Sequence, residues 1–107
     1  MDQFQTINIE QTQTLLLKPE AILADTRDSQ SFAQGHVEEA FPLNNDTIVE
    51  FMNEVEFEQP ILVMCYHGIS SQNVAQYLIN QGYSEVYSVD GGIEAWRRAG
   101  LPLTVSK

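Results

Sequence analysis

The sequence has a single cysteine, no long apolar run and no recognisable targeting segment. Because Cys65 is the only cysteine among 107 residues, no intramolecular disulfide can form, which excludes a secreted disulfide framework. The longest wholly apolar run, residues 61–66, is far shorter than the ~18 to 20 residues of a membrane-spanning helix. Residues 1–5 lack the basic and apolar regions of a signal peptide, so we expect a cytoplasmic protein that does not bind a membrane.

Basic residues are also scarce. The chain has 5 Lys and Arg against 15 Asp and Glu, which gives a formal net charge of −10 and a pI of about 4.3. Nucleic acid and anionic membranes bind basic surfaces, so both are expected to be poor partners. One cysteine and two separated histidines, His36 and His67, do not have the spacing of metal ligands, and no metal site is predicted.

The apolar content is sufficient for one hydrophobic core. Hydrophobic residues make up 43% of the chain and charged residues 19%, so wholesale disorder is not expected. No internal repeat, low-complexity tract or Gly/Ser-rich linker divides the sequence. Its length is that of one domain, and we therefore predict a single domain over residues 1–107.

Short apolar segments alternate with helical patterns along the chain. Strands are predicted at five places: residues 7–9, 21–25, 40–43, 60–64 and 86–89. Helices are predicted between and after them: residues 10–17, 28–33, 47–55, 71–81 and 93–99. The segment 60–64 has no polar alternation, which is typical of a central strand covered on both faces. The order predicts an α/β fold with about five mainly parallel strands and helices on both faces of the sheet.

Several helix ends carry recognisable signals. Asp28 is predicted to cap the second helix, and Gly35 to end it. Either Asn45 or Asp46 is predicted to cap the third helix. Gly82 follows the fourth helix as its terminal glycine.

Cys65 stands at the carboxyl end of the most apolar strand, immediately before the best-defined helix. Open α/β sheets bind ligands at this edge. The connecting loop is so short that several backbone N–H groups must point inward, and Gly68 permits the positive φ that this curvature can require. The N-terminus of the helix, near Ser70 and Ser71, adds further N–H groups and a positive dipole end.

These features lower the pKa of a cysteine from its usual ~8.5 and favour the thiolate. Cys65 is therefore a candidate nucleophile. The alternative is an inert core cysteine, because free cysteine is among the most buried residue types. The residues alone leave both interpretations open.

Other polar residues have structural interpretations. Arg27 is expected to form an ion pair with Asp25, and His36 to hydrogen-bond to backbone. His67 is either an exposed loop residue or a proton partner of Cys65, and whether His67 or Arg27 takes part in catalysis stays open. The three-residue spacing of Ile93 and Trp96 is that of a core stripe, so we expect both side chains to be buried in the core.

Two segments on either side of Cys65 resemble the signatures of the rhodanese family. DTRD at residues 25–28, FAQGHV at 32–37 and AFPL at 40–43 resemble the first signature. DGGIEAW at residues 90–96 resembles the closing segment, and Cys65 lies where rhodaneses carry their persulfide-forming cysteine. The run Cys65-Tyr66-His67-Gly68, the single domain and the acidic balance resemble single-domain thiosulfate sulfurtransferases of this family.

The resemblance implies a reaction. Cys65 would take the outer sulfur of thiosulfate, release sulfite, and pass the sulfur from a persulfide to cyanide or to a thiol or dithiol acceptor. No cofactor is implied. Substrate would be bound mainly by backbone N–H groups of the loop, at Tyr66, His67, Gly68, Ile69, Ser70 and Ser71.

The loop departs from the family pattern in one respect. Many rhodaneses carry Arg or Lys within or just after it, whereas residues 69–72 here are uncharged. The departure implies weak thiosulfate binding, and fits a donor or acceptor that is another protein, such as a thioredoxin-like partner.

Two other functions are alternatives to a sulfurtransferase. The related phosphatase and arsenate-reductase loops are one residue longer and close with an arginine, where this chain has Ser71. The second rival is a non-enzymatic rhodanese-like binding or regulatory module, or a protein persulfide carrier. The retained Cys65 favours the sulfurtransferase over such a module.

Overall fold

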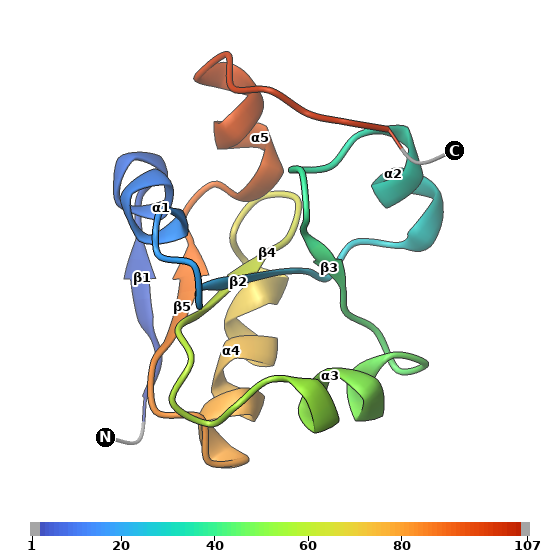
Figure 1. Cartoon of the computed structure of the whole chain (residues 1–107). Coiled ribbons are helices and arrows are strands. Elements are labelled where there is room, and N and C mark those ends of the chain that lie inside the picture. Colours follow the sequence, from blue (N-terminus) through green and yellow to red (C-terminus); the bar gives the residue numbers. More distant parts are fainter. Residues whose placement is uncertain (1–2, 106–107) are drawn as a thin grey trace.

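The computed structural model describes residues 3–105, so Met1 and Asp2 of the N-terminal segment lie outside the described residues. Strands and helices alternate along this part of the chain (Figure 1). The strands are β1 (Gln5–Ile7), β2 (Ile22–Asp25), β3 (Phe41–Pro42), β4 (Ile61–Met64) and β5 (Val86–Val89). The helices are α1 (Ile9–Leu16), α2 (Ser29–Gln34), α3 (Ile48–Glu54), α4 (Ser70–Asn80) and α5 (Gly92–Arg98).

The strands form one sheet in the order β1-β5-β4-β2-β3, and every neighbouring pair is parallel. All four residues of β4 are buried, which confirms the central strand that the apolar run predicted. Because parallel strands end at the same edge, the segments that follow β2, β4 and β5 meet beside Cys65.

Helices cover both faces of the sheet, as predicted. Alternate strand residues point to opposite faces. Leu62 and Met64 belong to a core cluster with side chains of α1 and α5, whereas Ile61 and Val63 belong to a second cluster with side chains of α3 and α4. Trp96 lies in the first cluster. Figure 1 shows α1 and α5 in the upper part of the view and α3 and α4 in the lower part. Ile93 is also buried in the first cluster, so the expected core stripe of α5 is confirmed.

Two predicted boundaries are wrong for local reasons. The first strand ends at Ile7 rather than at residue 9, because Asn8 caps α1 through a reciprocal pair of hydrogen bonds with Gln11. The N-cap of α3 is Thr47, and neither Asn45 nor Asp46 caps the helix. The side chain of Asn44 instead accepts the N–H groups of residues 46 and 47, which closes a turn before the helix.

The second helix begins and ends as predicted. Asp28 is the N-cap of α2 and its carboxylate accepts the N–H of Ser31 at 3.0 Å. Gly35 is the C-cap. The Nδ1 atom of His36 lies 2.8 Å from the carbonyl oxygen of Phe32, which confirms the expected bond to backbone.

Asp25 and Arg27 form a buried ion pair, as predicted. Both side chains are fully buried, and the guanidinium donates to both carboxylate oxygens of Asp25 at 2.9 to 3.2 Å. It also donates to the carbonyl oxygen of Gly35 at 2.7 Å, so the pair joins the end of β2 to the end of α2. Within residues 3–105, no helix is both long enough and apolar enough to cross a bilayer.

The ion pair gives a stability prediction. Asp25→Asn removes the negative partner of a buried cation, and we expect the free energy of unfolding to fall by about 3 kcal/mol. Urea denaturation followed by circular dichroism measures the change. Asp46→Asn is the control, because Asp46 is exposed and should change stability by less than about 0.5 kcal/mol. Equal effects of the two substitutions would contradict the structural role of the pair.

Candidate active site

Cys65 follows β4 directly, and its sulfur faces the inside of the loop that leads into α4. The N–H groups of Gly68 and Ser71 donate to Sγ at 3.1 and 3.3 Å. Gly68 has φ +86°, so the chain turns back over the sulfur through the left-handed conformation that glycine tolerates. The predicted inward curl and the predicted role of Gly68 are therefore both present.

The surroundings of Cys65 favour its thiolate. Burial alone raises the pKa of this thiol, but the hydroxyl groups of Ser71 and Ser70 and the N–H groups of Ser71 and Gly68 outweigh burial and lower the pKa to about 7. A large share of Cys65 is consequently ionised at neutral pH. The sequence interpretation relied on backbone groups, and the serine hydroxyls add donors that it did not include.

The sulfur lies beneath an exposed rim. Cys65 is only 3% exposed, as the core-cysteine alternative expected, yet its sulfur accepts hydrogen bonds from two backbone N–H groups. The side chains of Tyr66, His67 and Ile69 are exposed around it, Ile69 at 74%. An inert core cysteine would lack such donors, so the geometry is that of a reactive thiol.

The remaining loop residues differ in what they contribute. Among the described residues, the N–H groups of His67 and Ile69 donate to no acceptor, which leaves them available to an anion. The His67 side chain lies against Tyr66, with ring centroids 6.1 Å apart. In this part of the chain it forms no hydrogen bond with Cys65, so the structure does not bring the two together as a proton-sharing pair.

The start of α5 and the glycine turn that leads into it are packed against the Cys65 loop. The N–H of Ile93 donates to the carbonyl of Cys65 at 2.8 Å, and that of Glu94 to the carbonyl of Tyr66 at 3.1 Å. The contact is so close that a Cβ atom at Gly92 would lie 2.3 Å from the Cys65 oxygen. A Cβ atom at Gly68 would lie 2.6 Å from the nitrogen of Gly91. The resemblance marked residues 90–96 as the closing segment, and the contact of Gly91 and Gly92 with the loop was missed.

A buried serine pair holds the start of α4. The hydroxyls of Ser71 and Ser88 lie 2.7 Å apart, and both residues are fully buried. Ser88 comes from β5, where a polar residue in an apolar strand gave no sign of this contact. Ser71 therefore occupies the position of the arginine in phosphatase loops with a buried hydroxyl, and it offers no positive charge to an oxyanion.

Tyr66, the residue after Cys65, reaches the N-terminus of α2. The hydroxyl of Tyr66 is hydrogen-bonded to the hydroxyl of Ser31 and lies 3.3 Å from a carboxylate oxygen of Asp28. Hydrogen bonds from Ser31 lower the pKa of Asp28. The Tyr66 ring lies over the Arg27 guanidinium, 5.6 Å from ring centroid to Cζ, so that cation is covered rather than presented to the loop. No pattern in the sequence predicts this contact.

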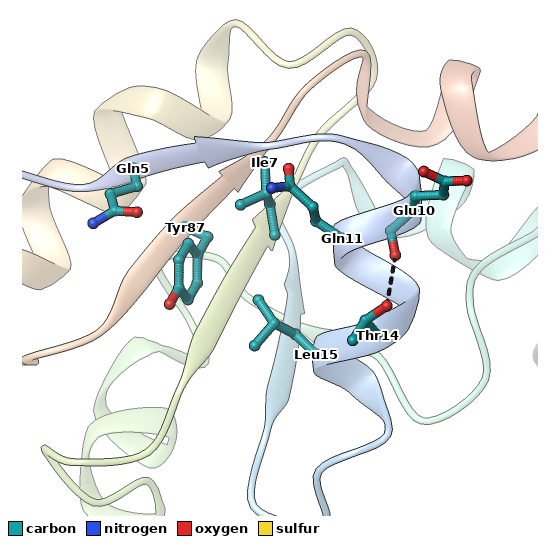
Figure 2. A pocket seen from close by; sticks show the side chains of 7 residues that line it. All are labelled: Gln5, Ile7, Glu10, Gln11, Thr14, Leu15 and Tyr87. Atoms are coloured by element: carbon teal, nitrogen blue, oxygen red, sulfur yellow. Dashed lines mark hydrogen bonds between the residues drawn. The ribbon is translucent and has the colours of Figure 1, made fainter.

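A cavity lies between β1 and α1, and its lining includes no residue of the Cys65 loop. Figure 2 shows this cavity of about 620 Å³ between β1, α1 and Tyr87, lined by glutamines, a threonine and aliphatic side chains. It contains no nucleophile. Within residues 3–105, no group of three or more His, Cys, Asp and Glu is placed to hold a metal ion.

The close contact at Gly92 gives a prediction for the site. Gly92→Ala places a methyl group against the Cys65 carbonyl at φ +55°, so we expect the loop to shift and the alkylation rate of Cys65 at neutral pH to fall. Gly100→Ala is the matched control, because φ there is +73° but no atom lies within 4 Å of the added carbon. The control should lose about 1 kcal/mol of stability and keep its alkylation rate. Unchanged reactivity in Gly92→Ala would show that the turn does not support the loop.

Comparison with known proteins agrees with this geometry. The family model of the rhodanese-like domain matches residues 8–99. The protein named thiosulfate sulfurtransferase GlpE from Vibrio cholerae serotype O1 is 55% identical over 106 residues, which cover 99% of this chain and 100% of that protein.

Solved structures show the same fold. The crystal structure of the Alr3790 protein from Anabaena has a TM-score of 0.83 at 20% identity, and the match covers 94% of this chain and 80% of that one. A rhodanese-like domain protein from Staphylococcus aureus has a TM-score of 0.81 at 26% identity, covering 97% of this chain and 100% of that one. The matched family model and the full-length relative establish that this chain belongs to the family of rhodanese-like domains.

Proposed function

We propose that the chain is a thiosulfate sulfurtransferase, acting as a single domain over residues 1–107, with Cys65 as its nucleophile. The observation that carries the proposal is the inward set of donors at the sole cysteine, which lowers its pKa to about 7. The Vibrio cholerae relative, named as a thiosulfate sulfurtransferase, is similar over its whole length and supports the same reaction.

The first half-reaction forms a persulfide. The Cys65 thiolate attacks the outer sulfur of thiosulfate, a new S–S bond forms, and the original S–S bond breaks. The electron pair of the broken bond leaves with sulfite. Because the nucleophile is already ionised, this step requires no general base, and the exposed His67 is not needed as one.

The loop supplies the binding groups. We assign substrate and persulfide binding to the backbone N–H groups of the loop and to the serine hydroxyls beside them, at residues Tyr66, His67, Gly68, Ile69, Ser70 and Ser71. These dipoles act within a few ångströms, whereas the repulsion from the net charge of −10 is screened over ~10 Å. An anionic donor can therefore bind without a cationic side chain, although it approaches against the net field.

The second half-reaction transfers the sulfur. An acceptor nucleophile attacks the outer sulfur of the persulfide, and Cys65 leaves as the thiolate that the loop stabilises. Cyanide, a dithiol or a thioredoxin-like protein can act as the acceptor. The chemistry needs neither metal nor cofactor, and a free thiol nucleophile suits a reducing compartment such as the cytoplasm.

A binding or regulatory module is the alternative function. Such a module requires the fold and an exposed surface, but it has no use for an ionised cysteine. The lowered pKa of Cys65 therefore favours the enzyme.

The reaction predicts a covalent product. Incubation with thiosulfate should add the mass of one sulfur atom to Cys65, as measured by mass spectrometry of the intact protein and of its peptides. Cys65→Ser should neither gain this mass nor form thiocyanate from cyanide, and it should keep the circular dichroism spectrum of the wild type. A wild-type protein that stays unmodified would support the binding module instead.

The pKa of Cys65 predicts the pH dependence of the first step. The thiolate is the reactive form, so its fraction and the rate of persulfide formation should rise about tenfold between about pH 6 and about pH 8, with a midpoint near 7. Single-turnover rates across this range measure the profile. Since histidines titrate in the same range, His67→Ala is the control and should keep the midpoint. A midpoint that moves with this substitution would assign the titration to His67.

A further inference from the structure

A groove lies between α3 and α4, on the face of the sheet where α4 leaves the Cys65 loop. Its volume is about 330 Å³. In Figure 1, α3 lies beside α4 in the lower part of the molecule. Four of its lining residues have aliphatic or aromatic side chains and three are asparagines: Leu43, Ile48, Val74, Tyr77, Asn44, Asn45 and Asn73. We refer to it as the α3–α4 groove.

One side of α4 connects the Cys65 loop to the α3–α4 groove. Ile69, Asn73 and Tyr77 follow one another at intervals of four residues, so they lie along one face of α4. Ile69 stands at the loop and is 74% exposed, and Tyr77 is 46% exposed in the groove. This side of α4 therefore offers a partly apolar surface between the loop and the groove, with the exposed Ile69 and Tyr77 at its ends and the polar Asn73 between them. A small anion such as thiosulfate has no use for it, whereas a protein that must place a thiol at Cys65 does.

The charge around the groove is of one sign. No Lys or Arg occurs between residues 28 and 96. The segment from the end of β3 to the start of β4 carries five acidic residues, all exposed: Asp46, Glu50, Glu54, Glu56 and Glu58. Asp46 and Glu50 lie within two residues of the lining residues Asn45 and Ile48, so a partner that covers the groove meets acidic side chains there, and basic side chains on its own surface would complement them.

We propose that the α3–α4 groove docks a protein sulfur acceptor that presents a reduced cysteine among apolar side chains, with lysines or arginines around them. This inference rests on the proposed function, because the docked cysteine is the one that receives the sulfur. Its thiolate attacks the outer sulfur of the Cys65 persulfide, the S–S bond breaks, and Cys65 leaves as a thiolate. The product is a persulfide on the partner, with no net oxidation or reduction and no further reactant.

Synthetic peptides test the chemistry that the groove selects. In one peptide a single cysteine is flanked by leucines and then by lysines, and in a matched peptide glutamates replace the lysines. Single-turnover transfer from persulfide-loaded protein is followed by mass spectrometry. We expect the lysine peptide to accept sulfur about tenfold faster than the glutamate peptide. Asp46→Lys combined with Glu50→Lys should reduce this preference, and Glu20→Lys, exposed in the turn after α1, should not.

The apolar contact is tested by Tyr77→Ser. Truncating this aromatic side chain should slow transfer to the lysine peptide about tenfold and leave transfer to cyanide within twofold. Leu17→Ser is the matched control, since Leu17 is 83% exposed at the end of α1 and outside the groove. Equal transfer rates for the wild type and Tyr77→Ser, or equal rates for the two peptides, would overturn the proposal.

A binding measurement separates docking from catalysis. Nuclear magnetic resonance of the labelled protein is recorded with the lysine peptide carrying serine in place of cysteine. Docking should shift amide signals of residues 43–48 and 69–77, and Tyr77→Ser should weaken these shifts. If they appear in a protein that takes no sulfur from thiosulfate, docking stands and the proposed function fails. If they are absent, docking fails whether or not the enzyme turns over.

Discussion

The hydrogen bonds from Gly68 and Ser71 to the sulfur of Cys65 are the interaction on which the site depends. Both donors are backbone groups, so their direction is set by the path of the chain. That path requires a left-handed residue at 68, and the glycine turn before α5 is packed against the carbonyls of residues 65 and 66. The position of the Cys65 thiol is therefore maintained by packing between two turns at the carboxyl edge of the sheet, and within residues 3–105 no histidine or carboxylate is hydrogen-bonded to it.

The same arrangement reconciles an acidic protein with an anionic donor. A thiolate, a persulfide anion and a bound thiosulfate all present negative charge to the loop, and N–H dipoles stabilise each of them without a counter-charge. The guanidinium that contacts the Tyr66 ring, that of Arg27, is paired with Asp25 and covered by Tyr66. Phosphoryl transfer requires cationic groups that stabilise the negative charge of the transferred phosphoryl group. Transfer of a single sulfur atom does not require such a cation in the loop. This agrees with Ser71 at the position where phosphatase loops have arginine.

Much of the fold could be predicted because single features determine it. The unbroken apolar run of β4 identified the central strand, and Asp28 and Gly35 delimited α2. Helix caps were less predictable where several polar residues adjoin. Asn8 caps the N-terminus of α1. At α3 the N-cap is Thr47 and Asn44 closes the turn before it, because either role suits any short polar side chain.

The site was predictable where it is local and was missed where it is not. Cys65 and Gly68 lie in one loop, so their relation follows from spacing and helix geometry. The Ser71–Ser88 pair and the contact of Tyr66 with Ser31 join segments 17 and 35 residues apart in the sequence. Nothing in the periodicity of a strand or a helix specifies such partners, because the tertiary packing selects them.

Burial of Cys65 has a consequence for how sulfur is passed on. At 3% exposure the thiol is shielded, and in the proposed persulfide the outer sulfur stands one bond beyond the buried atom. An acceptor therefore meets the sulfur to be transferred before it meets the cysteine. The broken bond then returns the charge to the buried atom, where the loop donors already point. Shielding of Cys65 is therefore compatible with the transfer step, in which the acceptor attacks the outer sulfur and not the cysteine.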